Sequence, residues 1–202
     1  MSEIPEVARL KTLAHELRSD DSQCPFSVDA AGSKQVTLPH YSGGRDATYV
    51  YVSRKWDGRV PLREVAVTIR YAPFVEGTTI IYDVTDEILQ GKARPFVCNL
   101  GRKMVRVYAV MPFQVEKITL RAAGGRADQE IQAAFLDARG ETIQAALPFE
   151  LRLLGASGKT LLTEYRSTDR LGQFSYKPEA DMPASKVVVR SLLTGREESI
   201  TL

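Results

Sequence analysis

Residues 101–122 read GRKMVRVYAVMPFQVEKITLRA, two stretches that alternate like β-strands and are separated only by Met111-Pro112-Phe113. Three residues are too few for a usual crossover, and they lack the Asn-Gly or Asp-Gly of a tight hairpin. Proline has no N–H to donate, so it ends a strand ladder. We therefore predict that one β-domain ends at Pro112 and that a second begins at residue 113. The alternative is one long strand with a proline bulge inside a single sandwich.

Short alternating segments bounded by Gly, Pro or Asp occur on both sides of this point. Before it, the predicted strands are 34–38, 48–53, 65–71, 78–83, 94–100 and 104–110. After it, they are 115–122, 129–136, 145–154, 160–167, 172–177, 186–192 and 198–202. Seven strands separated by turns at 137–140, 155–158 and 193–196 are typical of an immunoglobulin-like sandwich. The Cys…Trp…Cys core of antibody domains is missing from this half.

A helix is predicted only near the N-terminus, over residues 5–17. Pro5 suits a first helical turn, and apolar residues recur at intervals of three and four, at Val7, Leu10, Leu13, Ala14 and Leu17. The stripe indicates a helix that lies against the first sandwich. The predicted fold is thus all-β, with an N-terminal amphipathic helix (1–22) and two tandem β-sandwiches (23–112 and 113–202), the second immunoglobulin-like.

Composition excludes several classes of function. With 44% hydrophobic residues, 26% charged residues and a net charge of +2, the chain is typical of a soluble globular protein. Basic residues are interspersed with acidic ones, so we expect no nucleic-acid partner. No apolar run has the length of a membrane span, and no signal-peptide core is present. Cys24 and Cys98 leave the compartment open, since both a disulfide and two buried thiols are compatible with the sequence.

Catalytic and metal-binding motifs are weak. Residues 155–160 (GASGKT) end like a phosphate-binding loop, but Leu153 stands where the first glycine is required, and a hairpin loop is favoured. Asp83, Asp86 and Glu87 surround a turn and are the weak candidates for a metal site. Aspartate also favours turns by accepting hydrogen bonds from its own backbone, which explains the acids without a metal. We therefore expect no cofactor and no metal.

Aromatic residues are the remaining candidates for binding. Tyr49 and Tyr51 share one face of a predicted strand, Trp56 follows among charged residues, and Tyr41 precedes them. Exposed rings can stack on sugars while polar neighbours bind the hydroxyl groups. The competing interpretation is packing, since strands favour aromatic residues, and packing is favoured for Tyr49, Tyr51 and Trp56.

The segment 78–112, TTIIYDVTDEILQGKARPFVCNLGRKMVRVYAVMP, resembles the closing part of β-sandwich domains found toward the C-terminus of large bacterial glycoside-hydrolase-like proteins. The turn at 82–86 and the strands at 96–100 and 105–110 carry the resemblance. Asp86 replaces the turn glycine of that pattern, and Asn99 replaces its usual aspartate. Residues 113–202 are similar to the immunoglobulin-like modules that follow such domains. The resemblance implies a noncatalytic role, namely to support or space a catalytic domain or to mediate contacts.

The chain is therefore predicted to be a noncatalytic accessory or interaction module of a larger bacterial protein, which acts on carbohydrate if the analogy extends that far. Its expected partners are other domains of that parent or a separate protein, without membrane insertion. The parent's compartment is left open, and an extracytoplasmic parent is one alternative. Two functional alternatives remain: a carbohydrate-binding module that uses Trp56, Tyr41, Tyr49 and Tyr51, and a hydrolase with Asp83, Asp86 or Glu87 in acid–base roles.

Overall fold

The computed structural model of the chain describes residues 26–29, 36–54, 66–71, 79–86, 88–91, 96–100, 105–124, 129–179 and 182–202. Every regular element in these ranges is a β-strand, and the strand pairs are antiparallel. The all-β prediction is therefore confirmed for these ranges. The same ranges contain no helix that is long and apolar enough to cross a membrane. The predicted helix and residues 1–22 lie outside the described residues, as do Cys24, Trp56 and Glu87.

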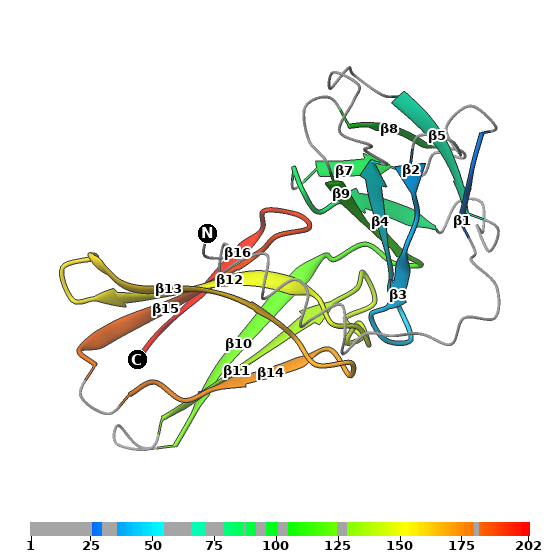
Figure 1. Cartoon of the computed structure of the whole chain (residues 1–202). Helices are drawn as coiled ribbons and strands as arrows, with labels where there is room; N and C mark the ends of the chain where they lie inside the picture. Colours follow the sequence, from blue (N-terminus) through cyan, green and yellow to red (C-terminus); the bar gives the residue numbers. More distant parts are fainter. Residues whose placement is uncertain are drawn as a thin grey trace.

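The strands before Pro112 form two sheets that pack face to face (Figure 1). One sheet has the order β1-β5-β8, with β1 at Phe26–Val28, β5 at Ala66–Tyr71 and β8 at Phe96–Asn99. The other has the order β2-β4-β9-β6-β7, at Val36–Thr37, Thr48–Arg54, Val105–Met111, Ile80–Asp83 and Ile88–Gly91, and β3 (His40–Ser42) pairs with β4. Between them, buried side chains form one core: Phe26, Val36, Val50, Val52, Val67, Ile69, Ile81, Cys98, Leu100, Tyr108 and Val110. We call this unit the first sandwich.

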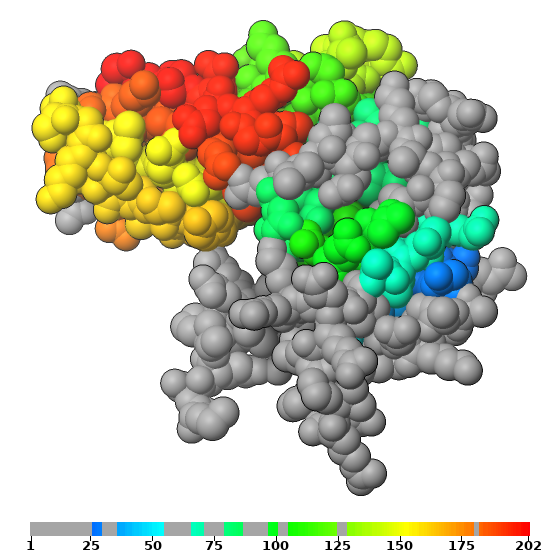
Figure 2. Space-filling model, turned by 90° about the horizontal axis from the view of Figure 1, so that it is seen from above, coloured from blue at the N-terminus to red at the C-terminus, as the bar shows by residue number. Residues whose placement is uncertain are grey.

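The strands after Pro112 form the second sandwich, which also has two sheets. One sheet has the order β10-β11-β14, at Lys117–Ala123, Glu130–Leu136 and Gln173–Tyr176. The other has the order β13-β12-β15-β16, at Thr160–Ser167, Pro148–Gly155, Ala184–Ser191 and Glu197–Thr201. Its core includes Ile118, Ile131, Phe135, Phe149, Leu151, Leu153, Val187 and Val189. Figure 2 shows the yellow-to-red strands of this sandwich on one side of the molecule and the blue and teal strands of the first on the other.

The fourth strand of the second sandwich, β13, pairs with β12. In constant-type immunoglobulin domains the fourth strand instead belongs to the sheet of the first, second and fifth strands. The described strands of this half are thus divided three against four, with the larger sheet built around β12 and β15.

Each predicted strand overlaps an observed one, but β1, β3 and β7 were not predicted. These three are short, and β3 follows Pro39 directly, so none of them is long enough to display a clear alternation. The predicted turn at 155–158 is confirmed, because the Gly158 N–H donates to the Gly155 carbonyl at 2.9 Å between β12 and β13. The GASGKT motif is therefore a hairpin loop and not a phosphate-binding loop.

Two further turns share the sequence pattern Asp-x-x-Gly. In the predicted turn at 137–140, Asp137 Oδ1 accepts hydrogen bonds from the N–H groups of Arg139 and Glu141, and Gly140 has a φ of 81°. The turn at 169–172 repeats this arrangement with Asp169 as the acceptor and Gly172 at a φ of 76°. The aspartate side chain satisfies backbone donors while glycine takes the left-handed conformation, so local chemistry favours both turns.

The sheet that contains β4, β9 and β6 has buried residues on both faces. Along β9, Tyr108 and Val110 belong to the core of the first sandwich. The alternating residues Ala109 and Met111 belong to the cluster that also contains the core of the second sandwich. Successive side chains of a strand point to opposite faces, so this sheet lies between two apolar layers. The double burial explains why VYAVM at 107–111 is a continuous apolar run instead of an alternating one.

Candidate functional site at the junction of the two sandwiches

The loop between β3 and β4, residues 43–47, binds the segment 144–146 of the second sandwich through its backbone. The Ala146 N–H donates to the Gly43 carbonyl at 2.6 Å, and the Asp46 N–H donates to the Gln144 carbonyl at 3.1 Å. The Gln144 N–H returns a bond to Asp46 Oδ2 at 2.8 Å, and Gly44 and Ala145 form an antiparallel bridge. These bonds make a short ladder between the two sandwiches, which we call the junction ladder.

Glycine is required at both positions of the Gly43-Gly44 pair. A Cβ at Gly44 would lie 2.6 Å from the Gln144 carbonyl oxygen, and the residue has a φ of 139°. A Cβ at Gly43 would lie 2.5 Å from the ring carbon Cε2 of Tyr49. Contacts this short are not tolerated, so the close approach to the second sandwich requires glycine at position 44, and the packing of the Tyr49 ring requires glycine at position 43.

Two buried tyrosines reach across the junction. The Tyr49 hydroxyl donates to the Ala146 carbonyl at 2.6 Å, and the Tyr82 hydroxyl accepts from the Val115 N–H at 3.2 Å. Burial raises the pKa of Tyr82 to about 12, partly offset by the bond from Val115, and burial also raises the pKa of Tyr49. Both phenols therefore remain neutral at ordinary pH and act as hydrogen-bonding ends of apolar side chains.

The linker between the sandwiches is held at several points. Besides the bond from Val115 to Tyr82, the Glu116 N–H donates to the Leu136 carbonyl at 2.9 Å. The Glu116 carboxylate also pairs with Arg196, in the turn before β16, at 2.9 Å. Val115 is fully buried. The linker is therefore part of the packed structure, which restricts any hinge motion at Pro112.

The predicted aromatic residues do not all reach the surface. Tyr49 is only 7% exposed, and its hydroxyl is bonded to Ala146 in the junction. Tyr41 and Tyr51 are half-buried and pack edge to face, with ring centroids 5.3 Å apart and an interplanar angle of 88°. Tyr51 also packs against the apolar cluster that spans the junction. Trp56 lies outside the described residues, so glycan binding by these aromatic residues stays a prediction.

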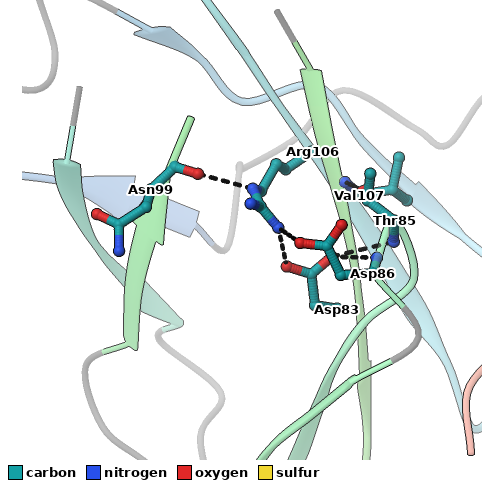
Figure 3. A network of polar contacts seen from close by, with 6 residues as sticks. All are labelled: Asp83, Thr85, Asp86, Asn99, Arg106 and Val107. Atoms are coloured by element: carbon teal, nitrogen blue, oxygen red, sulfur yellow. Dashed lines mark hydrogen bonds and ion pairs between the residues drawn. The ribbon is translucent and has the colours of Figure 1, made fainter. Parts of the chain in front are cut away.

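The predicted acidic candidates Asp83 and Asp86 both pair with Arg106 (Figure 3). Arg106 Nη1 lies 2.7 Å from Asp83 Oδ2 and also contacts the Asp86 carboxylate. Its Nε donates to the Asn99 carbonyl at 2.7 Å. The other oxygen of Asp83 accepts the N–H groups of Thr85 and Asp86, as the turn interpretation of this segment predicts. Arg106 thus links the β6–β7 turn to β8 in the opposite sheet.

This network resembles a structural clamp more than a catalytic pair. Asp83 is 1% exposed, and both of its oxygens have partners. The guanidinium of Arg106 supplies the positive charge that a bound cation would otherwise supply to the two carboxylates. In the part of the chain that the structure describes, no three His, Cys, Asp or Glu side chains come together as metal ligands. Cys98, nearby in β8, is a buried free thiol whose pKa is raised by burial.

A small polar hollow of about 100 Å³ lies beside the junction ladder. It is lined by Arg45, Asp46, Phe113, Asp137, Arg139, Glu141, Thr142, Ile143 and Gln144. Its charged groups largely neutralise one another: Arg139 pairs with Asp137 at 3.0 Å and Glu141 at 3.1 Å, and its guanidinium lies 5.0 Å from the centroid of the Phe113 ring. Desolvation opposes ionisation of Asp137, but hydrogen bonds from Glu141 and Arg139 lower its pKa. Most of the charged side chains that line the hollow are therefore paired with one another.

Sequence reasoning did not identify the junction ladder. Consecutive glycines at 43–44 are consistent with any turn, and nothing local in GGRDA indicates which distant segment the loop meets. The one available signal was the continuous apolar run at 107–111, which is typical of a strand buried on both faces.

No protein-family model matches this sequence, and no curated protein is significantly similar to it. Among solved structures, the chain is similar to native alpha-2-macroglobulin from Escherichia coli spanning domains MG0-NIE-MG1, with 13% identity and a TM-score of 0.31. The match covers 83% of this chain and 64% of that chain. A putative beta-galactosidase from Bacteroides fragilis matches with 14% identity and a TM-score of 0.26, over 83% of this chain and 33% of that chain. Likeness at this level does not assign the chain to a family.

Proposed function

We propose that the chain is a noncatalytic structural module of a larger bacterial protein, in which two β-sandwiches, the second immunoglobulin-like, are held at a fixed angle. The observation that carries the proposal is the junction ladder together with the anchored linker. A flexible tether would need neither a glycine that fits against the opposite backbone, as Gly44 does, nor a buried linker residue such as Val115. The bacterial parent rests on the sequence resemblance alone.

The pairing of the polar candidates supports the noncatalytic part of the proposal. Asp83 and Asp86 share Arg106, and Asp137 and Glu141 share Arg139. A general acid or base needs a carboxyl group that can exchange a proton with a substrate in a pocket. A carboxylate that already accepts hydrogen bonds at both oxygens is poorly suited to this. Turnover that Asp86→Asn abolishes, in an assay of the purified chain with polysaccharide substrates, would overturn this part.

The fixed angle can be measured with two spin labels in the intact chain. Val97 on β8 and Leu161 on β13 are exposed, so Val97→Cys and Leu161→Cys place one label on each sandwich. Cys24→Ser removes one native thiol, and Cys98 is buried with a raised pKa and therefore reacts poorly. We expect one narrow distance distribution by pulsed electron paramagnetic resonance. A broad distribution would overturn the fixed-angle proposal.

Glycan binding is the second candidate function, and the observation that favours it is the half-buried pair Tyr41 and Tyr51. A glycan array and polysaccharide-retention screen of the whole chain tests it. Tyr41→Ala is expected to abolish retention if the pair forms the site, whereas Tyr165→Ala serves as a matched control because Tyr165 is an exposed tyrosine on the other sandwich. The absence of retention across the screen, or equal retention by both variants, would exclude the tyrosine pair.

A further inference from the structure

We propose that the two sandwiches form a single cooperative folding unit, so that neither sandwich unfolds while the other remains native. This goes beyond the proposed function, because a fixed angle requires only that the sandwiches do not move relative to one another in the native state. Separate unfolding transitions are compatible with a fixed angle. A shared transition requires in addition that the stability of each sandwich depends on the other.

The first observation is that the core of the second sandwich extends over the outer face of the β4-β9-β6 sheet of the first sandwich. One continuous apolar cluster contains buried side chains from both sandwiches: Ala47, Tyr49, Ile80, Tyr82, Ala109 and Met111 from the first, and Ile143, Ala145, Leu147, Phe149, Leu151 and Val189 among those of the second. If the second sandwich unfolded alone, the first would expose this whole face to water. Exposure of contiguous apolar surface on that scale is rare in stable soluble domains.

The second observation concerns the sheet between the layers. β4, β9 and β6 are its three consecutive central strands, and the face of this sheet that belongs to the first sandwich packs on Val67 and Ile69 of β5. Its opposite face carries Tyr82 and Met111, which are almost completely buried. The strands of a β-sheet are hydrogen-bonded to one another, and packed interiors transmit strain. Loss of packing on one face of the sheet therefore disturbs the residues on the other face. The sheet thus couples the two cores physically.

The third observation is the distribution of buried polar partners. The hydroxyl of Tyr49 has its acceptor on Ala146, and the hydroxyl of Tyr82 has its donor on Val115. The Tyr49 bond requires the native segment 144–146, and the Tyr82 bond requires the native linker. Unfolding of the second sandwich therefore removes hydrogen bonds from the interior of the first.

Isoleucine methyl groups provide local probes for the test. Ile69 and Ile81 lie in the core of the first sandwich, and Ile118 and Ile131 lie in the core of the second. Urea titration of the whole chain, followed by NMR of its labelled isoleucine methyl groups, reports the unfolding of each core separately. We expect coincident midpoints for all four methyl groups. Loss of the native Ile118 and Ile131 signals while those of Ile69 and Ile81 persist would overturn the proposal.

A conservative lesion in each core sharpens the test. Ile131→Val removes one methylene deep in the second sandwich, and it should lower the midpoints of Ile69, Ile81 and Ile118 by the same amount. The reciprocal change, Ile69→Val, should lower the midpoints of Ile81, Ile118 and Ile131 equally. Both changes are mild enough for the chain to fold. A shift confined to the sandwich that carries the lesion would show independent units, even if the spin-label distance distribution is narrow.

Discussion

The hydroxyl of Tyr49 donates a hydrogen bond of 2.6 Å to the carbonyl oxygen of Ala146, a residue 97 positions later in the chain. The donor lies on β4 of the first sandwich, and the acceptor lies in the loop that leads to β12 of the second. This bond makes a side chain of one sandwich part of the interior of the other, and it gives the most direct test of the junction.

Replacing Tyr49 by phenylalanine should destabilise the whole chain. The change keeps the ring and removes the hydroxyl, so the Ala146 carbonyl loses a buried donor, which costs about 1–3 kcal/mol. For a chain of this length, each kcal/mol corresponds to a fall of about 2–4 °C in Tm. Thermal unfolding monitored by circular dichroism measures the shift. Tyr165→Phe is the matched control, since Tyr165 is 56% exposed, and equal effects of the two changes would contradict a special role for Tyr49.

Replacing Gly44 by alanine should loosen the junction, because the new Cβ would lie 2.6 Å from the Gln144 carbonyl oxygen. Gly158→Ala is the control, because Gly158 also has a positive φ but has no atom within 4 Å of its Cβ position. Both changes introduce backbone strain of about 1–2 kcal/mol, whereas only the first introduces a clash. Spin-label distances should broaden for Gly44→Ala alone. Unchanged distances would show that the ladder does not set the angle between the sandwiches.

Replacing Arg106 by glutamine should lower the free energy of unfolding more than most single substitutions of the polar residues described above. It leaves the buried Asp83 carboxylate without its counter-charge, which costs about 3–5 kcal/mol. Arg166→Gln breaks the exposed pair with Glu164 and should cost about 0–1 kcal/mol. Urea unfolding gives both values. Similar losses for the two variants would show that the Arg106 network is not the clamp described above.

Stability should fall at alkaline pH through the junction tyrosines. The ordinary pKa of a tyrosine is 10.0, and burial raises that of Tyr82 to about 12. The neutral phenol is therefore favoured by the folded state, and its contribution is complete below pH 10 and is lost as the pH rises toward 12. Urea midpoints between pH 9 and about pH 12 measure this loss. Tyr82→Phe should flatten the decline, and an unchanged slope would assign the effect to other groups.

Much of the fold was predictable, because strand alternation and turn chemistry are local signals. The predicted strands overlap observed ones on both sides of Pro112, and the Asp137 turn forms with the backbone hydrogen bonds that its residues favour. The strands that were missed, such as β3 at His40–Ser42, are too short to alternate visibly. The prediction that Asp83 serves a turn is also confirmed by the N–H groups of Thr85 and Asp86.

The junction was not predictable from the sequence, because it depends on contacts between distant segments. No role was predicted for Gly43 and Gly44, and the reason for glycine at Gly44 lies in the backbone of Gln144. Tyr49 was weighed as a stacking platform or as packing, and the structure places it in the packed interior. Arg106 had no local signal that identified it as the partner of Asp83, which lies in a different strand.

The double burial of β9 implies an unusual pattern of mutational tolerance. In β11, buried and less buried positions alternate, so a scan with polar substitutions should find accepted and rejected positions in turn along that strand. In β9, the four positions from Tyr108 to Met111 are all buried, so the same scan should reject polar residues at every one of them. Natural variation at this site would then be limited to swaps among apolar residues of similar volume, and sequence drift in either sandwich would be constrained by the shape of the other.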